Sequence, residues 1–369
     1  MDSQQPFIEQ ALALAARSIG LSEPNPRVGC VIVSADGQQV LGTGNTQAAG
    51  QAHAEVMALR DAASRGLSVA GATVYVTLEP CSHQGRTAPC CDALIAAGVA
   101  KVVASLPDPN PLVSGQGFAR LKAAGVKLEV GPGAVASKEL NIGFFSRMLR
   151  RRPWLRMKVA ASLDGKTALD NGASQWITSE MARADGHAWR ARAAAVLTGI
   201  GTLRQDDPRL DVRSVPIARQ PVAAVVDSRL ETPLDARIFI PERHLIVYCA
   251  VPDAGRQAAL EARGATVVCI PAAEGKVDLA AMLRDLAERE VNELHVEAGH
   301  KLNGALIQAG VVDELLIYLA PKLVGHGREM AHFGPLADLA SAVAFEFLSS
   351  DRIGPDLRVL ARIPGADKF

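Results

Sequence analysis

Strand-like apolar segments alternate with amphipathic helical segments along nearly the whole chain, and this alternation constrains the fold more than any other feature. It excludes all-α and all-β architectures. In the first third, Asp36-Gly37 marks a hairpin turn between two expected strands. The expected helices there cover 7–19, 53–65, 91–97 and 117–124, and the expected strands cover 28–33, 39–41, 73–77, 101–104 and 126–130.

The alternation breaks once, at the basic segment RMLRRRP that ends at Pro153. A chain of 369 residues is long enough for about two domains, so we expect a boundary near 148–152. The second half predicts an independent α/β domain. Its expected strands cover 155–161, 194–199, 222–227, 244–249, 266–270, 293–297 and 313–319, and its expected helices cover 179–191, 256–263, 277–289 and 301–309.

The composition disfavours several classes of protein. The 39 basic residues equal the 39 acidic ones, so no net field attracts a nucleic acid. The N-terminus MDSQQPFIEQ is not a secretory leader, and no apolar stretch approaches the roughly 18 residues that span a membrane. Six cysteines are too few for a disulfide scaffold of this length. We therefore expect a cytoplasmic protein with reduced thiols and no membrane partner.

One histidine, two cysteines and one carboxylate occur in a pattern typical of a catalytic zinc site. His53 and Glu55 begin an expected helix, Cys81 follows the next strand, and Cys90 precedes the next helix. One imidazole and two thiolates leave the fourth position of a tetrahedral zinc ion open for water. A carboxylate at Glu55 can pass the proton of that water to a leaving amine. The pattern predicts a Zn²⁺ site and hydrolytic deamination.

Two other cysteines leave alternatives open. Cys91 competes with Cys90 for the third ligand position, although we expect its thiol to face the core. Cys30 lies in the apolar segment VGCVIV, where packing is the expected role. If Cys91 were a fourth ligand, the site would be closed and structural, but Glu55 beside three ligands favours catalysis.

Residues 25–111 resemble the deaminase half of the bifunctional riboflavin-biosynthesis deaminase/reductases, which have a cytidine-deaminase-like zinc fold. The resemblance rests on NPRVGCVIV, HAEVMAL, VTLEPCSHQGRTAPCCDALI and DPNP. Many zinc deaminases have two residues between their cysteines, whereas eight separate Cys81 from Cys90, as is typical of this subfamily. The second half resembles that family's reductase domain in KVAASLDGKTA, SQWIT, GIGTLRQDDPRLDVR, VDSRL, VEAGHKLNGAL and DELLIYLAPKLVG.

The resemblance implies a fold for each half and a set of deaminase residues. The expected domains are a cytidine-deaminase-like three-layer α/β/α domain over 1–148 and a dihydrofolate-reductase-like α/β domain over 152–369. His53, Cys81 and Cys90 match the family's zinc ligands, and Glu55 matches its proton shuttle. The positions that match contacts to the pyrimidine and its ribose phosphate are Asn25, His83, Arg86, Asp108 and Asn110.

A dinucleotide site in the second half has to be argued without the usual motif. Gly199-Ile200-Gly201 does not continue as a G-x-G-x-x-G sequence, so the Rossmann fingerprint is absent. The strand ends near 199 and 297 run into helices, whose first amides can bind a pyrophosphate. The resemblance implies NADPH, with matching cofactor positions at Ala160, Trp176, Thr202, Asp206, Ser228, Gly299, His300, Lys301, Leu302, Asn303, Gly304 and Ala305.

The resemblance also implies a reductase substrate site. Arg190 and Arg213 suit a ribose 5-phosphate, and Lys158 could polarise the opening sugar as a catalytic residue. Alternatively, Lys158 is a salt-bridged strand residue and Trp176 is part of the core. The remaining matching positions are Ser174, Leu210 and Glu297.

Together these features predict two consecutive reactions. The first removes the 2-amino group of 2,5-diamino-6-(ribosylamino)pyrimidin-4-one 5'-phosphate. The second uses NADPH to reduce the ribosyl group of 5-amino-6-(5-phosphoribosylamino)uracil to ribityl. Two alternatives are a cytidine or nucleobase deaminase with a non-catalytic binding domain, and a ligand-binding protein with structural zinc. Zero net charge and 4% aromatic residues disfavour the first alternative if its substrate is RNA. The family likeness implies a homo-oligomer, a dimer or a tetramer.

Overall fold

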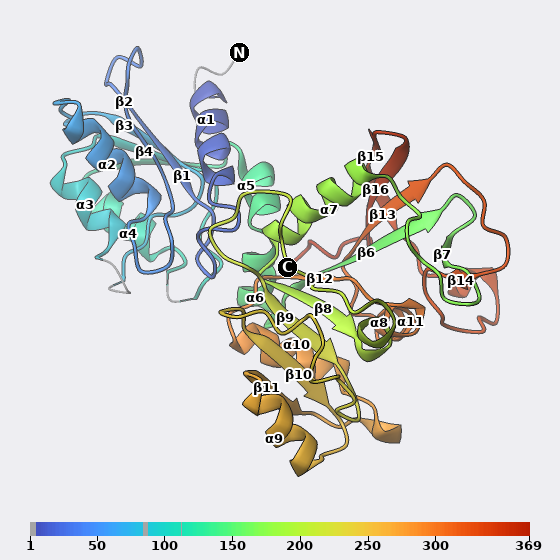
Figure 1. Cartoon of the computed structure of the whole chain (residues 1–369). Coiled ribbons are helices and arrows are strands. Elements are labelled where there is room, and N and C mark those ends of the chain that lie inside the picture. The colour runs from blue at the N-terminus through green and yellow to red at the C-terminus, as the bar shows by residue number, and fades with distance from the viewer. Residues whose placement is uncertain (1–4, 84–87, 112) are drawn as a thin grey trace. The chain divides into compact units, whose positions relative to one another are not determined.

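The computed structural model describes residues 5–83, 88–111 and 113–369, which form two compact units, Met1–Arg150 and Arg151–Phe369 (Figure 1). Each unit has its own β-sheet with helices packed against it. The mixed α/β class predicted from the alternation is confirmed. Of the helices in the described part of the chain, none is long and apolar enough to cross a membrane.

The first unit contains a mixed five-stranded sheet in the order β2-β1-β3-β4-β5. β1 runs antiparallel to both of its neighbours, whereas β3, β4 and β5 are parallel. Its elements are α1 (Gln5–Ala16), β1 (Gly29–Val33), β2 (Val40–Asn45), α2 (Ala54–Ser64), β3 (Thr73–Val76), α3 (Cys90–Ala96), β4 (Lys101–Ala104), α4 (Gln116–Ala123), β5 (Lys127–Val130), α5 (Ala134–Leu140) and α6 (Ile142–Arg150).

Helices cover both faces of this sheet, as a three-layer arrangement requires. On one face, Ile8 and Ala11 of α1 pack with Val31 of β1 in a buried cluster. On the other face, α2 lies so close to β2 that a Cβ atom at Gly44 would fall 2.3 Å from the carbonyl oxygen of Ala54. Glycine in β2 therefore brings the first turn of α2 directly against the strand.

The second unit contains a nine-stranded sheet in the order β11-β10-β9-β8-β12-β6-β13-β16-β15. The strands from β11 to β13 are parallel, and β16 and β15 form an antiparallel edge. Two further strands, β7 (Lys166–Ala168) and β14 (Arg328–Glu329), pair with each other in a separate two-stranded sheet. The strands of the large sheet are β6 (Trp154–Ser162), β8 (Ala195–Gly199), β9 (Val222–Val226), β10 (Leu245–Cys249), β11 (Ala265–Cys269), β12 (Glu293–Val296), β13 (Glu314–Ala320), β15 (Glu346–Ile353) and β16 (Asp356–Arg362).

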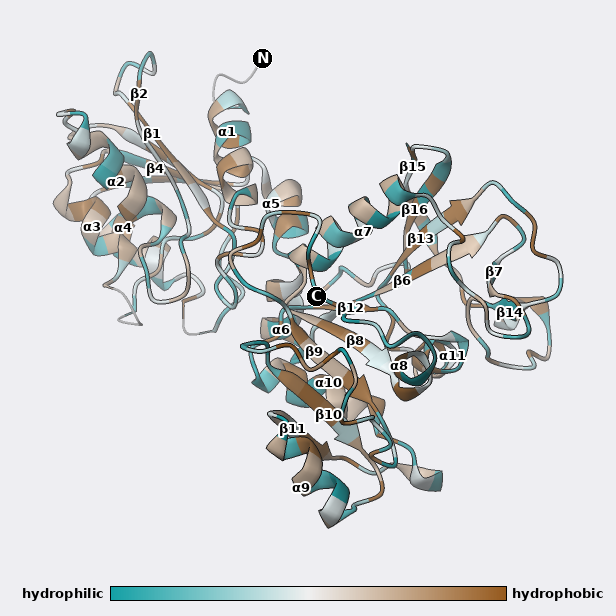
Figure 2. Cartoon of the chain, viewed as in Figure 1, coloured by the Kyte–Doolittle hydropathy of each residue, from teal (hydrophilic) through white to brown (hydrophobic). Residues whose placement is uncertain are grey.

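Buried parallel strands need apolar residues on both faces, and Figure 2 shows β9 and β10 coloured as hydrophobic. One face carries the core around Leu197, Ile246 and Leu294, and the other carries Val196, Val225 and Val247. The helices are α7 (Glu180–Arg192), α8 (Ile200–Asp206), α9 (Ala254–Ala262), α10 (Leu279–Glu288) and α11 (His300–Gln308), with short 3-10 turns at Ala273–Gly275 and Leu339–Ser341.

Most predicted elements form within a few residues of their expected bounds, but several were missed or misplaced. β2 extends to Asn45 because its pairing with β1 continues to Gly29, which the local pattern at 39–41 did not indicate. α1 ends at Ala16 rather than 19, since tight turns replace its last helical bonds. An apolar strand pattern at 344–348 overlaps β15, whereas α5, α6, α8, β7, β14 and β16 were not predicted from the sequence.

Candidate functional site

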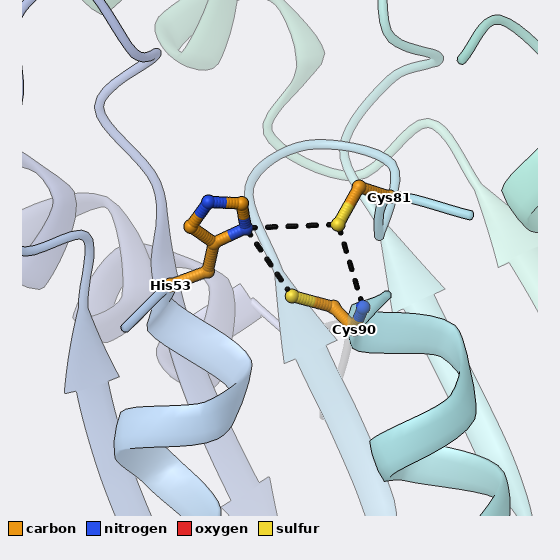
Figure 3. A group of neighbouring side chains, drawn as sticks. All are labelled: His53, Cys81 and Cys90. Atoms are coloured by element: carbon orange, nitrogen blue, oxygen red, sulfur yellow. Dashed lines mark hydrogen bonds between the residues drawn. The ribbon is translucent and has the colours of Figure 1, made fainter. Parts of the chain in front are cut away.

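The first unit brings His53, Cys81 and Cys90 together at the ends of two helices (Figure 3). His53 is the N-cap residue of α2, and Cys90 is the first residue of α3. His53 Nδ1 lies 3.6 Å from Cys81 Sγ and 3.3 Å from Cys90 Sγ. All three ligand atoms lie within 4.8 Å of one another.

These distances suit zinc. Zn–N and Zn–S bonds of about 2.1 and 2.3 Å in a tetrahedron place nitrogen and sulfur about 3.6 Å apart. The amide of Cys90 donates to Cys81 Sγ at 3.4 Å. Hydrogen bonds, of which the one from the Cys90 thiol has the largest effect, lower the pKa of Cys81 and so favour a thiolate at this position. The donor set can hold one zinc ion with its fourth position open.

Glu55 is a buried carboxylate beside this cluster. It lies in the first turn of α2 and is 4% exposed. Burial, and next the charge of Cys81, raise the pKa of Glu55 to about 7. A carboxyl group with such a pKa can both accept and release a proton near neutral pH.

In the structure Cys90 belongs to the cluster, whereas Cys91 and Cys30 do not. The Cys91 thiol donates to the carbonyl oxygens of Pro80 and Gly117 at 3.1 and 3.5 Å, away from the cluster. Burial raises the pKa of Cys91 to about 12. Cys30 is completely buried in β1, and burial raises its pKa as well.

Glu79 organises the loop beside the cluster, a role that was not predicted from the sequence. Its buried carboxylate accepts from the amides of Asp108, Gly115 and Phe118 at 3.0–3.1 Å. The loop that follows β4 is thereby tied to the residue two positions before Cys81. The adjoining Pro80-Cys81 motif could have drawn attention to Glu79, but its three partners lie about 30–40 residues away in sequence.

The predicted contacts to the deaminase substrate have different surroundings. Asp108 is buried, and burial raises its pKa to about 7, while its carboxylate accepts from the amide of Asn110 at 2.7 Å. Asn25 is half-buried in a turn, and its carbonyl accepts from Ser22 Oγ at 3.2 Å. His83 is exposed. Arg86 lies outside the described residues.

A cavity of about 650 Å³ opens next to His53. Of the three clustered ligands, His53 is the one among its described lining residues, and Val56, Met57 and Arg60 of α2 line the cavity with it. Its other lining residues are Gln47, Gly50, Gln51, Ala52 and Ala88.

The second unit holds a larger cavity of about 820 Å³ near the carboxyl ends of its central parallel strands, the usual location of ligands in such sheets. Six arginines and Lys158 line it, against three carboxylates among the described lining residues. Such a surface suits a ligand with several phosphates. Twelve of the predicted cofactor and substrate positions line this cavity: Lys158, Ala160, Ser174, Trp176, Arg190, Thr202, Asp206, Leu210, Arg213, Glu297, Gly299 and His300.

Glu297 is the centre of an ion network in this cavity. Arg190 donates to both of its oxygens, at 2.7 and 2.9 Å, and Lys158 Nζ lies 3.9 Å away. Burial opposes ionisation of Glu297, yet Arg190 and Lys158 hold its pKa well below the usual range. Burial also lowers the pKa of Lys158. Lys158 is therefore salt-bridged, as the alternative interpretation predicted, and it also lines the cavity.

Asp211 accepts hydrogen bonds from several arginine side chains. It accepts from Arg209 at 2.9 Å and from Arg213 at 2.7 Å, and its carbonyl accepts from Arg190. Sequence reasoning did not single out Arg209, although it lies within the segment GIGTLRQDDPRLDVR. It also missed Arg183, Arg237 and Arg328, which line the cavity from segments far apart in sequence.

Several predicted cofactor positions lie outside this cavity. Ser228, after β9, and residues 301–305 of α11 are not among the described residues that line the cavity. The amide side chain of Asn303 donates to the carbonyl of Met330 at 2.9 Å, and Gly304 lies against the backbone of His332. The suggestion that Trp176 belongs to the core is wrong, since its side chain is 63% exposed.

Comparison with protein families matches both halves of the chain. Residues 1–106 match the cytidine and deoxycytidylate deaminase zinc-binding region, and residues 153–359 match the RibD C-terminal domain. The chain is 44% identical to riboflavin biosynthesis protein RibD of Escherichia coli (strain K12) over 95% of its own length and 97% of the relative. It is 37% identical to riboflavin biosynthesis protein RibD of Aquifex aeolicus (strain VF5), over 95% of its own length and 96% of the relative.

Solved structures resemble the whole chain. Acinetobacter baumannii RibD is 39% identical, with a TM-score of 0.88 and 98% of each chain covered. A diaminohydroxyphosphoribosylaminopyrimidine deaminase/5-amino-6-(5-phosphoribosylamino)uracil reductase from Thermotoga maritima is 30% identical, with a TM-score of 0.87 and coverage of 98% of this chain and 99% of that one.

Proposed function

The chain belongs to the family of RibD riboflavin-biosynthesis proteins, and from that premise we propose how its residues divide two reactions between its two halves. It is a bifunctional enzyme, a deaminase and a reductase. Zinc and NADPH are the cofactors of these activities. We assign the deaminase to residues 1–148 and the reductase to residues 152–369.

His53, Cys81 and Cys90 hold the zinc ion in this proposal. When bound, zinc lowers the pKa of a water molecule from about 15.7 to about 7. The buried carboxylate of Glu55 would accept one proton of the attacking water and deliver it to the amine, which leaves as ammonia. The second proton of the water ends on the ring nitrogen, and the carbon that carried the amine becomes a carbonyl. Asn25, His83, Arg86, Asp108 and Asn110 would bind the pyrimidine ribotide.

The observation that carries the deaminase proposal is the meeting of three ligand atoms within 4.8 Å, with the buried carboxylate of Glu55 in the same helical turn as His53. Three ligands, with no fourth one grouped with them in the described part of the chain, fit a catalytic zinc site better than a structural one. This arrangement also argues against the alternative of a ligand-binding protein with structural zinc.

In the second half, NADPH supplies a hydride when bound. Arg190 and Arg213 would bind the ribose phosphate, and Ser174 and Leu210 would contact the substrate. Lys158 carries its proton beside Glu297 and can donate a hydrogen bond to the sugar oxygen as the ring opens. The helix that begins at His300 and the residues Thr202, Asp206 and Gly299 would receive the cofactor.

We also propose that the enzyme is a cytoplasmic homo-oligomer. A reducing compartment keeps the ligand thiols available for metal. Phe347 of the edge strand β15 is 80% exposed, Leu348 is 45% exposed, and Leu339 nearby in sequence is 93% exposed. Exposed apolar residues on an unpaired edge are typical of an interface, here with a second copy of the chain. Sedimentation of the wild type and of Phe347→Lys tests this: a larger species that Phe347→Lys dissociates supports it, and a wild-type monomer refutes it.

A paired assay on protein of known zinc content tests the two reactions. Ammonia release is measured with the diaminopyrimidinone ribotide, and NADPH oxidation with the deaminated product. We expect both, with chelation abolishing only the first. Failure to release ammonia from zinc-loaded protein would refute the deaminase assignment, and equal loss of both rates on chelation would refute separate sites.

A further inference from the structure

Two cysteines outside both sites lie side by side in the second unit. Cys249 is the last residue of β10, and Cys269 is the last residue of the neighbouring strand β11. The parallel pairing of these strands makes Cys249 and Cys269 direct register partners. Both thiols are free, and a hydrogen bond between them contributes to the raised pKa of Cys249.

The two side chains lie on the same face of the sheet. Cys249 belongs to a buried cluster with Val247 and Leu245, whose register partners are Val267 and Ala265. Ala265 is buried in that cluster and Val267 packs against it, so the alternation of β11 places Cys269 on this face too. Adjacent strands lie about 4.7–4.9 Å apart, within the about 4.4–6.8 Å that a disulfide spans between Cα atoms.

The surroundings give the two thiols different reactivity. Cys269 is exposed at the end of an edge strand, where a small molecule can reach it. Cys249 is 1% exposed, and burial raises its pKa to about 12. Cys269 is therefore the thiol that meets an oxidant first, and Cys249 is the partner that resolves the product.

We propose that Cys249 and Cys269 form a redox-sensitive modification site that small-molecule disulfides, such as oxidised glutathione, convert to an intrachain disulfide. The Cys269 thiolate attacks the small disulfide, forms a mixed disulfide and releases one small thiol. The Cys249 sulfur then attacks Cys269 Sγ, gives up its proton and releases the second small thiol. The two cysteines together lose two electrons and two protons, and the small disulfide is reduced to two thiols.

The site also predicts a physical consequence of oxidation. The bond would join the edge strand β11 to β10 and close a loop that contains α9. Such a link reduces the conformational freedom of the unfolded chain. Oxidised protein should therefore unfold at a higher denaturant concentration. All three tryptophans lie in the second unit, so tryptophan fluorescence reports its unfolding.

The test uses zinc-loaded, full-length protein treated with oxidised glutathione. Free thiols are then alkylated under denaturing conditions and mapped by mass spectrometry. We expect a peptide pair joined through Cys249 and Cys269, alkylated Cys30 and Cys91, unchanged zinc content, and reversal by dithiothreitol. A stable glutathione adduct on Cys269 without the cross-link would overturn the proposal, and so would earlier oxidation of Cys81 or Cys90 with loss of zinc.

Two variants separate the steps. Cys249→Ala should accumulate the glutathione adduct on Cys269, because no second thiol resolves it. Cys269→Ser, a change at an exposed position, should show neither adduct nor cross-link and no shift of the unfolding midpoint. Two results would contradict the proposed stabilisation by a bond between β10 and β11. One is a shift of the unfolding midpoint of the same size in Cys269→Ser. The other is a cross-linked wild type whose unfolding midpoint does not rise.

Discussion

The Sγ atom of Cys90 lies 3.3 Å from Nδ1 of His53, although 36 residues separate the two along the chain. Each residue begins a helix, and the ends of these helices meet at the carboxyl end of β3. Cys91 follows Cys90 directly, yet its thiol donates to the carbonyl of Pro80. Successive residues of an α-helix point about 100° apart, so one of the two thiols can face His53 and the other cannot.

This difference predicts the outcome of two cysteine substitutions. Cys90→Ser should weaken zinc binding by more than about 100-fold, since losing a ligand exceeds the 10–100-fold effect typical of outer partners. Cys91→Ser should keep zinc and ammonia release near the wild-type level. Zinc content after dialysis against a weak chelator distinguishes them, and the reverse result would make Cys91 the ligand.

Glu55→Gln should lower the rate of ammonia release by about 10²- to 10⁴-fold, because the amide cannot accept the proton of the attacking water. Zinc content and NADPH oxidation should not change, since Glu55 is not one of the three clustered ligands and lies in the other unit from the reductase cavity. Both rates are measured on one preparation. A matching fall in both would show that the two activities share a site.

Arg190→Lys should lower kcat/KM of the reductase by about 10- to 100-fold while ammonia release stays unchanged. A lysine cannot reproduce the two parallel hydrogen bonds, 2.7 and 2.9 Å long, that Arg190 donates to Glu297. Steady-state kinetics with varied substrate measures the effect. Arg204→Lys is the matched control, since its partner Glu231 lies on the surface and is not among the residues lining the cavity. Equal effects of the two changes would remove the special role of Arg190.

Gly44→Ala should destabilise the first unit by about 1–3 kcal/mol, the usual cost of overpacking. The added methyl group would lie 2.3 Å from the Ala54 carbonyl oxygen and would push away the turn that carries His53 and Glu55. Thermal unfolding followed by circular dichroism, together with zinc content, measures this. Gly186→Ala in α7 serves as the control, because an added Cβ there meets no atom within 4 Å apart from its chain neighbours and the backbone of its own helix. Unchanged stability of Gly44→Ala would mean that α2 can shift freely.

His187 should make the second unit less stable in mild acid. Burial, and next the charges of Arg190 and Arg213, lower the pKa of His187 to about 4, whereas an unfolded histidine titrates near 6.5. Between these values the unfolded chain binds more protons, so the free energy of unfolding falls as the pH falls from about 6.5 to 4. His187→Gln should reduce that fall by about 1–2 kcal/mol after allowance for solvent screening. Denaturant titrations at pH 4.5 and 7 measure it, and parallel pH dependences would exclude the effect.

The sequence predicted the residue types and the order of the deaminase constellation because most of that information is local. Alternating patterns located strands and helices, and a histidine and a carboxylate at one helix start, a cysteine after a strand and a cysteine at the next helix start indicated zinc chemistry. The family resemblance also predicted a reductase in the second half, where no local motif indicated a dinucleotide site. The family, the α/β class and the bifunctional activity expected from these residues are all confirmed.

Only the tertiary structure decided which side chains meet. It turned Cys90 rather than Cys91 toward His53, joined Glu79 to three distant amides, and paired Arg190 with Glu297 across 107 residues. It also placed Cys249 opposite Cys269. Such contacts depend on strand order, register and helix rotation. These are set by packing over the whole sheet, so a pattern read along one segment cannot specify them.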